Sequence, residues 1–419
     1  MPAPAPVSQR DRVETLDVLR GFALLGILAM NVRAMAAPFS AYMYPYYPFD
    51  YTGASRLAYL FTSVVFDLKM MGLFSMLFGA GALLYAAKTT PGDRAPRALW
   101  FRRMGWLLGI GLVHAYLIWD GDILVPYALC GMLLLWWVRQ WPARRLAAAA
   151  AVLLFAGAAL GASWGQMWDV MPAELRASES ELWMPTREQS IAQLAALHGS
   201  YLEVVARRAP FAFESQTFVF ATFFLWRCGG MMLLGMALWK WGFLDGRRAA
   251  RDYALASAIC LPVGLALAGY GSTRLEAVRY AMPERTVADL WNYMGAVLAS
   301  IGYAATLILI VRSGAVAGLR HALAAVGQMA LTNYLMHSVI GAIVFLGWGF
   351  GVAGRADYAE QLLVVAGVWV LQLIASPLWL RQFRFGPAEW IWRSLTYWER
   401  QPMRRTTPSE RPTRAIVGA

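Results

Sequence analysis

One histidine lies close to two carboxylates within an otherwise apolar stretch of this sequence. His114 is followed by Asp120 and Asp122 in the segment GLVHAYLIWDGDIL, residues 111–124. Histidine exchanges protons near neutral pH, and a carboxylate beside it sets its tautomer and charge. The pattern predicts a general base at His114 that Asp120 or Asp122 orients. Two alternatives stay open: a structural histidine bonded to a neighbouring helix, and an aspartate that caps the helix after residue 122.

A second pair of polar residues, Arg20 and Asn31, lies in the first apolar run. They are eleven residues apart, which is about three helical turns, so they point in nearly the same direction from opposite ends of one helix. Asn31 is a candidate to hold the carbonyl of one substrate or the group of a second substrate that accepts a transferred group. Arg20, with Arg102 or Arg103, is a candidate to attract an anionic substrate that donates this group. The alternatives are an arginine that anchors the helix at the membrane surface and an asparagine that bonds to another helix.

Two further polar groups are candidates for substrate binding, because ionisable side chains inside a membrane are costly. Asp67 and Lys69 precede the apolar segment LFSMLFGAG, residues 73–81. Asn333 and His337 are four residues apart on one helical face, and Gln328 lies further toward the predicted cytoplasmic side. The alternatives are a shallow interfacial segment for the first group and interhelical hydrogen bonds for the second.

Several sequence motifs of common enzyme classes are absent. There is no GxxxxGK[ST], HExxH, GxSxG or dinucleotide-binding fingerprint, so ATP-driven transport, zinc proteolysis and serine hydrolysis have no motif to support them. Four histidines, His114, His198, His321 and His337, give little basis for a metal centre or a permanently bound cofactor. Cys130, Cys228 and Cys260 lie in apolar runs without CxxC spacing, which predicts small buried apolar residues.

Composition places the chain among membrane proteins. Of its 419 residues 59% are hydrophobic and 15% charged, whereas soluble domains have about 45–50% apolar and about 25% charged residues. The formal net charge of +12 comes from short basic segments between apolar runs. That arrangement orients a chain in a lipid bilayer and requires no nucleic acid partner.

Ten apolar runs are long enough to be considered as transmembrane helices, since about 20 residues cross about 30 Å of hydrocarbon. Arginine and lysine gather in alternate connections, which predicts that both termini face the cytoplasm. The sequence therefore predicts an all-α, polytopic transmembrane bundle of about ten helices. The runs are 17–36, 62–87, 104–119, 123–139, 146–165, 217–239, 253–270, 290–311, 324–349 and 361–380.

The chain divides into an N-terminal transmembrane half (1–165), an extracytoplasmic segment (166–216), a C-terminal transmembrane half (217–400) and a disordered basic tail (401–419). Within the second segment, residues 191–206 are predicted to be helical. Near the C-terminus, FGPAEWIWRSLTYWER predicts an amphipathic helix at the headgroup level.

Five segments carry a family resemblance that covers nearly the whole chain. They resemble the YeiB-like bacterial membrane proteins, which share a domain of unknown function, number 418. The segments are LDVLRGFALLGILAMN (16–31), LFSMLFGAG (73–81), RRMGWLLGIGLVHAYLIWDGDIL (102–124), GQMALTNYLMHSVI (327–340) and SPLWLRQFRFGPAEWIWRSLTY (376–397).

The LRG opening is also similar to that of membrane acyltransferases, namely acyltransferase family 3 and the heparan-alpha-glucosaminide N-acetyltransferase type. In family 3 a histidine is expected where this chain has Asn31. In the second type an asparagine is similar to this one, and a catalytic histidine follows shortly after it. Residues 32–60 contain no histidine. His114 would then take the place of the catalytic histidine of these acyltransferases.

The resemblance implies an enzyme of the bacterial inner membrane that moves an acyl group from a cytoplasmic donor, with acyl-CoA as co-substrate, to a glycan or lipid acceptor on the outer side. A secondary transporter, in which Asp67, His114 and His337 relay protons or bind a solute, is the first alternative. A non-enzymatic envelope protein is the second. The oligomeric state stays open, a dimer included.

Overall fold

Helix α1 (Glu14–Ala36) lies at the centre of a helical bundle, and most of its side chains are buried. In the computed structural model, which describes residues 14–86 and 94–405, α1 packs against α4 (Lys69–Ala86), α15 (Ala317–Gln328) and α16 (Ala330–Phe345). The backbones of α1 and α15 approach closely because Gly21 and Gly327 have no Cβ atoms to separate them.

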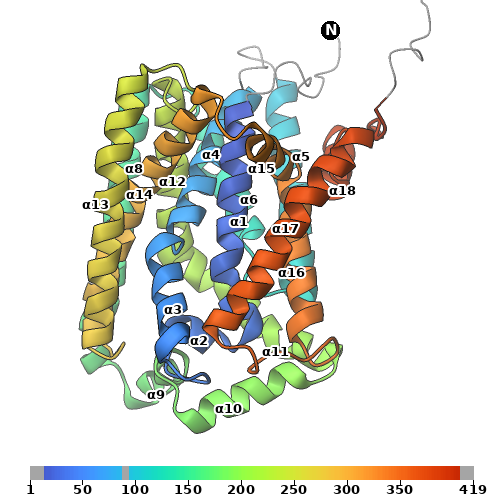
Figure 1. Cartoon of the computed structure of the whole chain (residues 1–419). Helices are drawn as coiled ribbons and strands as arrows, with labels where there is room; N and C mark the ends of the chain where they lie inside the picture. The colour runs from blue at the N-terminus through green and yellow to red at the C-terminus, as the bar shows by residue number, and fades with distance from the viewer. Residues whose placement is uncertain (1–13, 87–93, 406–419) are drawn as a thin grey trace, which may run out of the picture.

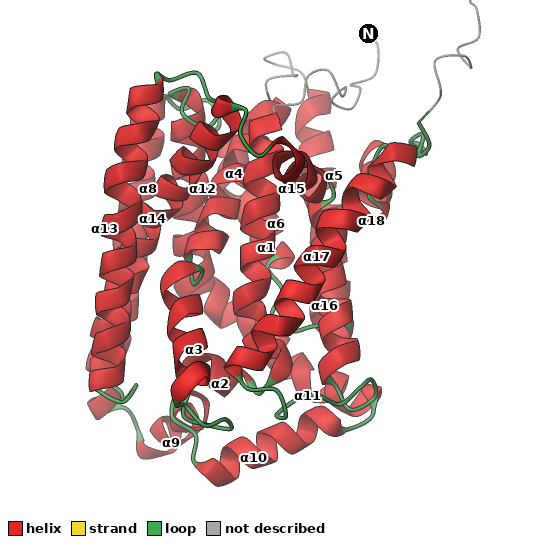
Figure 2. Ribbon diagram, viewed as in Figure 1, coloured by secondary structure: helices red, strands yellow, loops and turns green. Residues whose placement is uncertain are grey.

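Helices account for nearly all regular structure, and no strand occurs in the described ranges apart from an isolated bridge between Phe383 and Arg404 (Figure 2). The prediction of an all-α membrane bundle is confirmed. The other helices up to residue 167 are α2 (Phe39–Met43), α3 (Gly53–Val65), α5 (Arg94–Leu117), α6 (Leu124–Cys130), α7 (Trp136–Val138) and α8 (Ala143–Met167), and a π-helical turn, Gly131–Leu135, joins α6 to α7.

The remaining helices follow residue 167. They are α9 (Ala173–Trp183), α10 (Arg187–Ala195), α11 (Tyr201–Glu214), α12 (Leu225–Lys240), α13 (Ala250–Ala277), α14 (Glu284–Ser313), α17 (Tyr358–Gln382) and α18 (Pro387–Tyr397). A π-helical segment, Ser215–Phe224, joins α11 to α12. The helix predicted at 191–206 is interrupted, because α10 ends at Ala195 and α11 starts at Tyr201 with Ser200 as its N-cap.

Among the described residues, seven helices are long and apolar enough to cross a membrane, or eight if α15 and α16 form one span. These two helices meet at 84°, so the run predicted at 324–349 is bent. The stretch Leu124–Val138 is a shorter apolar helix of about 22 Å, less than the roughly 30 Å of the hydrocarbon layer. The count of ten stays a prediction.

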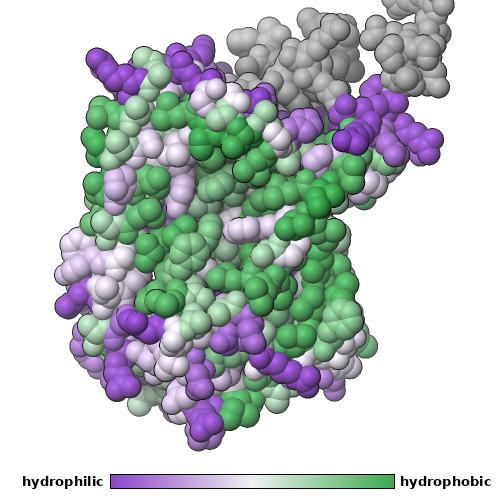
Figure 3. Space-filling view, in the orientation of Figure 1, coloured by the Kyte–Doolittle hydropathy of each residue, from purple (hydrophilic) through white to green (hydrophobic). Residues whose placement is uncertain are grey.

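The described chain begins and ends on one side of the bundle. In Figure 1 the start of α1 and the helix α18 lie at the upper end, and α9 and α10 lie at the lower end. On the face shown in Figure 3, hydrophobic residues cover the middle and hydrophilic residues gather at both ends. This distribution fits a multi-pass protein in contact with lipid. That the upper end faces the cytoplasm stays a prediction.

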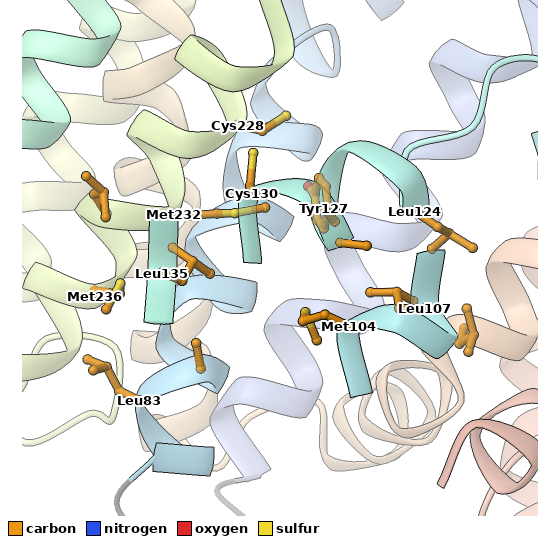
Figure 4. Close-up of a cluster of buried hydrophobic side chains, with 14 of the residues drawn as sticks. Leu83, Met104, Leu107, Leu124, Tyr127, Cys130, Leu135, Cys228, Met232 and Met236 are labelled. Atoms are coloured by element: carbon orange, nitrogen blue, oxygen red, sulfur yellow. The ribbon is translucent and has the colours of Figure 1, made fainter. Parts of the chain in front are cut away.

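A buried cluster holds α6 against α12 (Figure 4). Tyr127, Cys130 and Met232 have almost no exposed surface, and the Tyr127 hydroxyl lies 2.7 Å from the Ser75 hydroxyl of α4. Cys130 and Cys228 are buried, as predicted, whereas Cys260 is partly exposed. Because α6 is fixed in this way, the loop that precedes it has a defined position.

The C-terminal helix α18 packs against α5 and α16 near the upper end of the bundle (Figure 1). Trp392 donates to the carbonyl of Arg103 at 2.9 Å, and Trp390 donates to the carbonyl of Gln401 at 2.7 Å. Of the tail predicted at 401–419, residues 401–405 return along α17, where the amide of Arg405 donates to the carbonyl of Gln382. Residues 406–419 lie outside the described part of the chain.

Candidate active site

The loop between α5 and α6, residues 118–123, lies inside the bundle. The apolar helix Leu124–Val138 that follows it is shorter than a membrane span, and we expect the loop to lie at the depth of the hydrocarbon layer. Irregular backbone at that depth requires partners from the protein. Tyr201 of α11 donates to the carbonyl of Leu117 at 2.8 Å, and the amide of Ile123 donates to the Tyr334 hydroxyl at 3.1 Å. The sequence Asp-Gly-Asp explains why no helix continues here.

Three side chains form a hydrogen-bonded chain at this loop. Asp122 Oδ1 lies 2.7 Å from His114 Nδ1, and His114 Nε2 lies 2.9 Å from the hydroxyl oxygen of Ser338 on α16. His114 is 0% exposed, Ser338 1% and Asp122 4%. The arrangement is that of an Asp-His-Ser triad, in which the histidine can remove the serine proton.

The orientation of the imidazole follows from the second oxygen of Asp122. That oxygen, Oδ2, accepts from the amide of Val125 at 2.7 Å, in the first turn of α6. With Asp122 ionised, and so only accepting hydrogen bonds, a neutral His114 donates from Nδ1, and its Nε2 accepts from the hydroxyl of Ser338. Asp122 therefore orients His114 and also satisfies a free amide of α6, so both roles weighed from the sequence occur in one residue.

Aromatic rings enclose the triad. The ring of Trp119 lies edge-on to that of His114 with a centroid distance of 6.4 Å, and the ring of Tyr334 lies at 5.2 Å. Trp119 also lines a cavity of about 10 Å³ that Tyr201 of α11 and Trp348 border. This volume holds about one water molecule. Trp119 therefore lies beside the imidazole and also borders this small cavity.

Asp120 faces away from the triad. Its carboxylate lies 3.4 Å from Nε of Arg208 on α11. Of the two aspartates that the sequence offered as partners for His114, the structure brings Asp122 to the imidazole and Asp120 to Arg208. Asn31 is half-buried, and its side chain makes no hydrogen bond to the described residues, so no hydrogen bond joins that side chain to His114.

The three candidate arginines lie toward the upper end of the bundle. Arg20 forms an ion pair of 3.0 Å with Asp17, and the guanidinium groups of Arg102 and Arg103 lie over the indoles of Trp398 and Trp392, at 4.6 and 3.7 Å. Along α5, eleven residues separate Arg103 from His114, which corresponds to about 16 Å of helix. The arginines thus lie at a distance from the triad.

The predicted substrate-binding residues separate into two groups. His337 Nε2 lies 2.9 Å from Gln372 Oε1, and Gln372 donates to the carbonyl of Asn333 at 3.0 Å. These contacts join α16 to α17, so Asn333 and His337 take part in interhelical hydrogen bonds, which was the alternative to a substrate-binding role. Gln328 is the last residue of α15, at the bend before α16.

Asp67 and Lys69 form the other group, at the break between α3 and α4. Leu68 has a positive φ of 58°, which a helix does not permit. Lys69 is 0% exposed and donates to the carbonyl of Ser63 at 2.9 Å and to Asn292 Oδ1 at 2.5 Å. Asn292 in turn donates to Asp67 Oδ2 at 2.7 Å. A lysine with no exposed surface is not in a solvated interfacial segment.

Two residues at these sites, Ser338 and Asn292, were not predicted from the sequence, and neither was Arg227, a buried arginine of α12. Ser338 is 224 residues from His114, so no local spacing joins them. Arg227 lies in the middle of the run 217–239, and a charge inside an apolar run is itself a signal of function. In the described ranges no group of three His, Cys, Asp or Glu residues is placed to hold a metal ion.

Comparisons with known proteins find uncharacterised relatives. Residues 238–399 match the family described as Protein of unknown function (DUF418), and this region contains Ser338 but neither His114 nor Asp122. Uncharacterized protein YeiB of Escherichia coli (strain K12) is 30% identical over 394 residues, which are 92% of this chain and 96% of the relative. Uncharacterized protein YxaH of Bacillus subtilis (strain 168) is 29% identical over 428 residues, 96% of this chain and 98% of the relative.

Proposed function

This chain belongs to the YeiB family, and from that premise we propose that it is an acyltransferase of the bacterial inner membrane. The observation that carries the proposal is the chain of hydrogen bonds from Asp122 through His114 to Ser338. A serine bonded to an imidazole, which a carboxylate holds in turn, is an arrangement that activates a nucleophile. Acyl transfer is the reaction class that such a nucleophile serves.

In the first half-reaction, Ser338 Oγ attacks the carbonyl carbon of an acyl thioester while His114 Nε2 takes the hydroxyl proton. The carbon–sulfur bond breaks, an ester to Ser338 forms, and the leaving thiol takes the proton from His114. In the second half-reaction, a hydroxyl or amine of the acceptor gives its proton to His114 and attacks the ester carbonyl. The bond to Ser338 Oγ breaks, and His114 returns the proton to that oxygen, which restores Ser338. Asp122 stabilises the imidazolium in both steps.

We assign the donor to the upper end of the bundle, taken as the cytoplasmic side. Arg102 and Arg103 there place positive charge and indole rings at the start of α5, and the anionic part of acyl-CoA suits such a surface. Its long pantetheine arm would extend along α5 toward Ser338. A glycan or lipid acceptor would approach from the side of α10 and α11.

Burial of the triad has a chemical consequence for this function. His114 and Ser338 have almost no exposed surface, and Trp119, beside the imidazole, lines a small cavity. Substrate entry therefore requires displacement of Trp119 and the loop around it. Exclusion of water from the acylated serine favours transfer over hydrolysis.

The test uses the purified full chain in detergent, incubated with radiolabelled acyl-CoA of several chain lengths. We expect label on the protein, and mass spectrometry of its peptides should place the acyl group on Ser338. Ser338→Ala should lose the label. Ser376→Ala is the matched control, since Ser376 is an equally buried serine of α17 that accepts from Asn333 and makes no contact with His114.

Two results would refute the proposal. One is a wild-type protein that takes up no label from any donor. The other is Ser338→Ala protein that keeps the label at the wild-type level.

A further inference from the structure

Helices α4, α12 and α14 converge at a point away from the triad. The Ser300 hydroxyl of α14 donates to the carbonyl of Lys69 in α4 at 2.9 Å. A Cβ atom on Gly72 of α4 would lie 2.7 Å from Ser300 Oγ and 3.0 Å from Met231 Cε of α12. The three helices are thus in contact at the level of Gly72, Met231 and Ser300.

One turn toward the lower end, the same faces carry polar groups. Lys69 precedes Gly72 by three residues, and Arg227 precedes Met231 by four. Residues three or four apart lie on one side of a helix, so both cations face the region where α4, α12 and α14 meet. Arg227 donates to the carbonyl of Tyr293, and Lys69 donates to the side chain of Asn292, so the two cations contact adjacent residues of α14.

Arg227 has unused hydrogen-bonding capacity. It is 0% exposed, its Nη1 donates to the carbonyl of Tyr293 at 2.8 Å, and its guanidinium carbon lies 4.6 Å from the centre of the Tyr293 ring. Its Nε and Nη2 make no hydrogen bond to any described residue. These two nitrogens are the adjacent pair whose parallel N–H groups match the two oxygens of a carboxylate or phosphate.

The charges at this point do not balance. With Lys69 protonated, Arg227 and Lys69 contribute two positive charges, and Asp67 contributes one negative charge. The oxygens of Asp67 accept from Tyr42 at 2.9 Å and from Asn292 at 2.7 Å. No ion pair within 4 Å joins Arg227 or Lys69 to a carboxylate in residues 14–86 and 94–405. A buried, unpaired guanidinium is costly, so a negative group would stabilise it.

We propose that Arg227 and Lys69 bind one oxyanion, a carboxylate or a phosphate, inside the bundle. Nε and Nη2 of Arg227 hold two of its oxygens, and the ammonium of Lys69 supplies the third N–H that Ser63 and Asn292 leave free. Asp67 and Asn292 are only partly buried, so the ligand enters from their side, at the break between α3 and α4. This site does not depend on acyl transfer at Ser338.

Binding is measured on the purified full chain by equilibrium dialysis against radiolabelled inorganic phosphate and acetate. Thermal unfolding in mixed micelles with phosphatidylglycerol, compared with phosphatidylcholine, tests a lipid headgroup as the source of the oxyanion. We expect saturable binding of one oxyanion per chain by at least one route. Binding of the free ions identifies a soluble ligand, and stabilisation by phosphatidylglycerol alone identifies a lipid.

Arg227→Gln removes the charge but keeps a donor for the Tyr293 carbonyl, and should weaken binding by about tenfold or more. Arg227→Lys keeps the charge without the paired N–H groups and should bind with an intermediate affinity. Arg247→Gln is the matched control, because the side chain of Arg247 is 72% exposed and its replacement causes the same change in net charge. It should bind as the wild type does.

The proposal would be overturned if the wild-type protein showed saturable binding of none of the probes. Water would then be bound to the free N–H groups of Arg227. Equal affinity of a folded Arg227→Gln protein and the wild type would overturn it as well. If Arg227→Gln does not fold, the measurements on the wild type and on Arg227→Lys decide together. Retention of oxyanion binding by Ser338→Ala would separate this site from the proposed active site.

Discussion

Replacement of Asp122 by asparagine changes the tautomer of His114 with little change in shape. The amide of Val125 donates to one side-chain atom of residue 122, so the carbonyl oxygen of an asparagine would face it. The NH₂ group then points at His114 Nδ1, 2.7 Å away, and donates to it. Nδ1 must accept, Nε2 carries the proton, and the imidazole cannot remove the proton of Ser338.

The expected loss of acylation rate is large. In serine proteases the same change of tautomer lowers turnover about 10⁴-fold, which corresponds to about 5.5 kcal/mol in the activation barrier. The effect on folding is smaller, since two hydrogen bonds to a charged oxygen become bonds to a neutral amide, at a cost of about 1 kcal/mol each. A catalytic role therefore predicts that activity falls far more than stability.

The assay measures acylation of Ser338 by rapid quench and the thermal midpoint of the same protein in detergent. Asp357→Asn serves as the control, because Asp357 accepts two amides at the start of α17 and does not contact a histidine. It should lower the midpoint slightly and leave the acylation rate unchanged. An Asp122→Asn protein that folds and acylates within tenfold of the wild-type rate would refute the tautomer argument.

Two further predictions concern stability. Burial raises the pKa of Glu389, which accepts from the amides of Leu331 and Thr332. The stabilising contribution of Glu389 is present below its unfolded pKa and is lost as the pH rises through the folded pKa. The thermal midpoint of Glu389→Gln relative to wild type should therefore rise with pH across that range, and a constant difference would contradict this. Gly235→Ala should lower the thermal midpoint at every pH, because a Cβ atom there would overlap the carbonyl of Met76 and push α12 from α4; an unchanged midpoint would contradict it.

The sequence predicts the membrane bundle and the local half of the triad. His114 and Asp122 are eight residues apart, so a pattern search finds them together. Composition and apolar runs indicate helices in lipid because the chain must satisfy its backbone internally. The contact between His114 and Ser338 joins residues from opposite halves of the chain, and one sequence contains no signal for it.

The breaks in the helices are the other feature that the sequence did not reveal. The run 62–87 contains the end of α3, a turn at Leu68 and α4, and the run 324–349 bends by 84° near Met329. Leucine and methionine are ordinary helix residues, so propensity gives no warning at either position. Tertiary packing determines both breaks.

The two polar centres share one structural device, since each lies where a helix ends inside the bundle. At residues 117–123 the free backbone groups bind Tyr334 and Tyr201, and at the α3–α4 break they bind Lys69. A break inside lipid leaves amides and carbonyls that only such side chains can satisfy, so it is costly unless polar groups gather around it. The same gathering places Asp122, bonded to His114, at one break and Lys69 at the other. The interrupted helices therefore account for why the polar chemistry of this chain occurs at these two positions and not along its continuous helices.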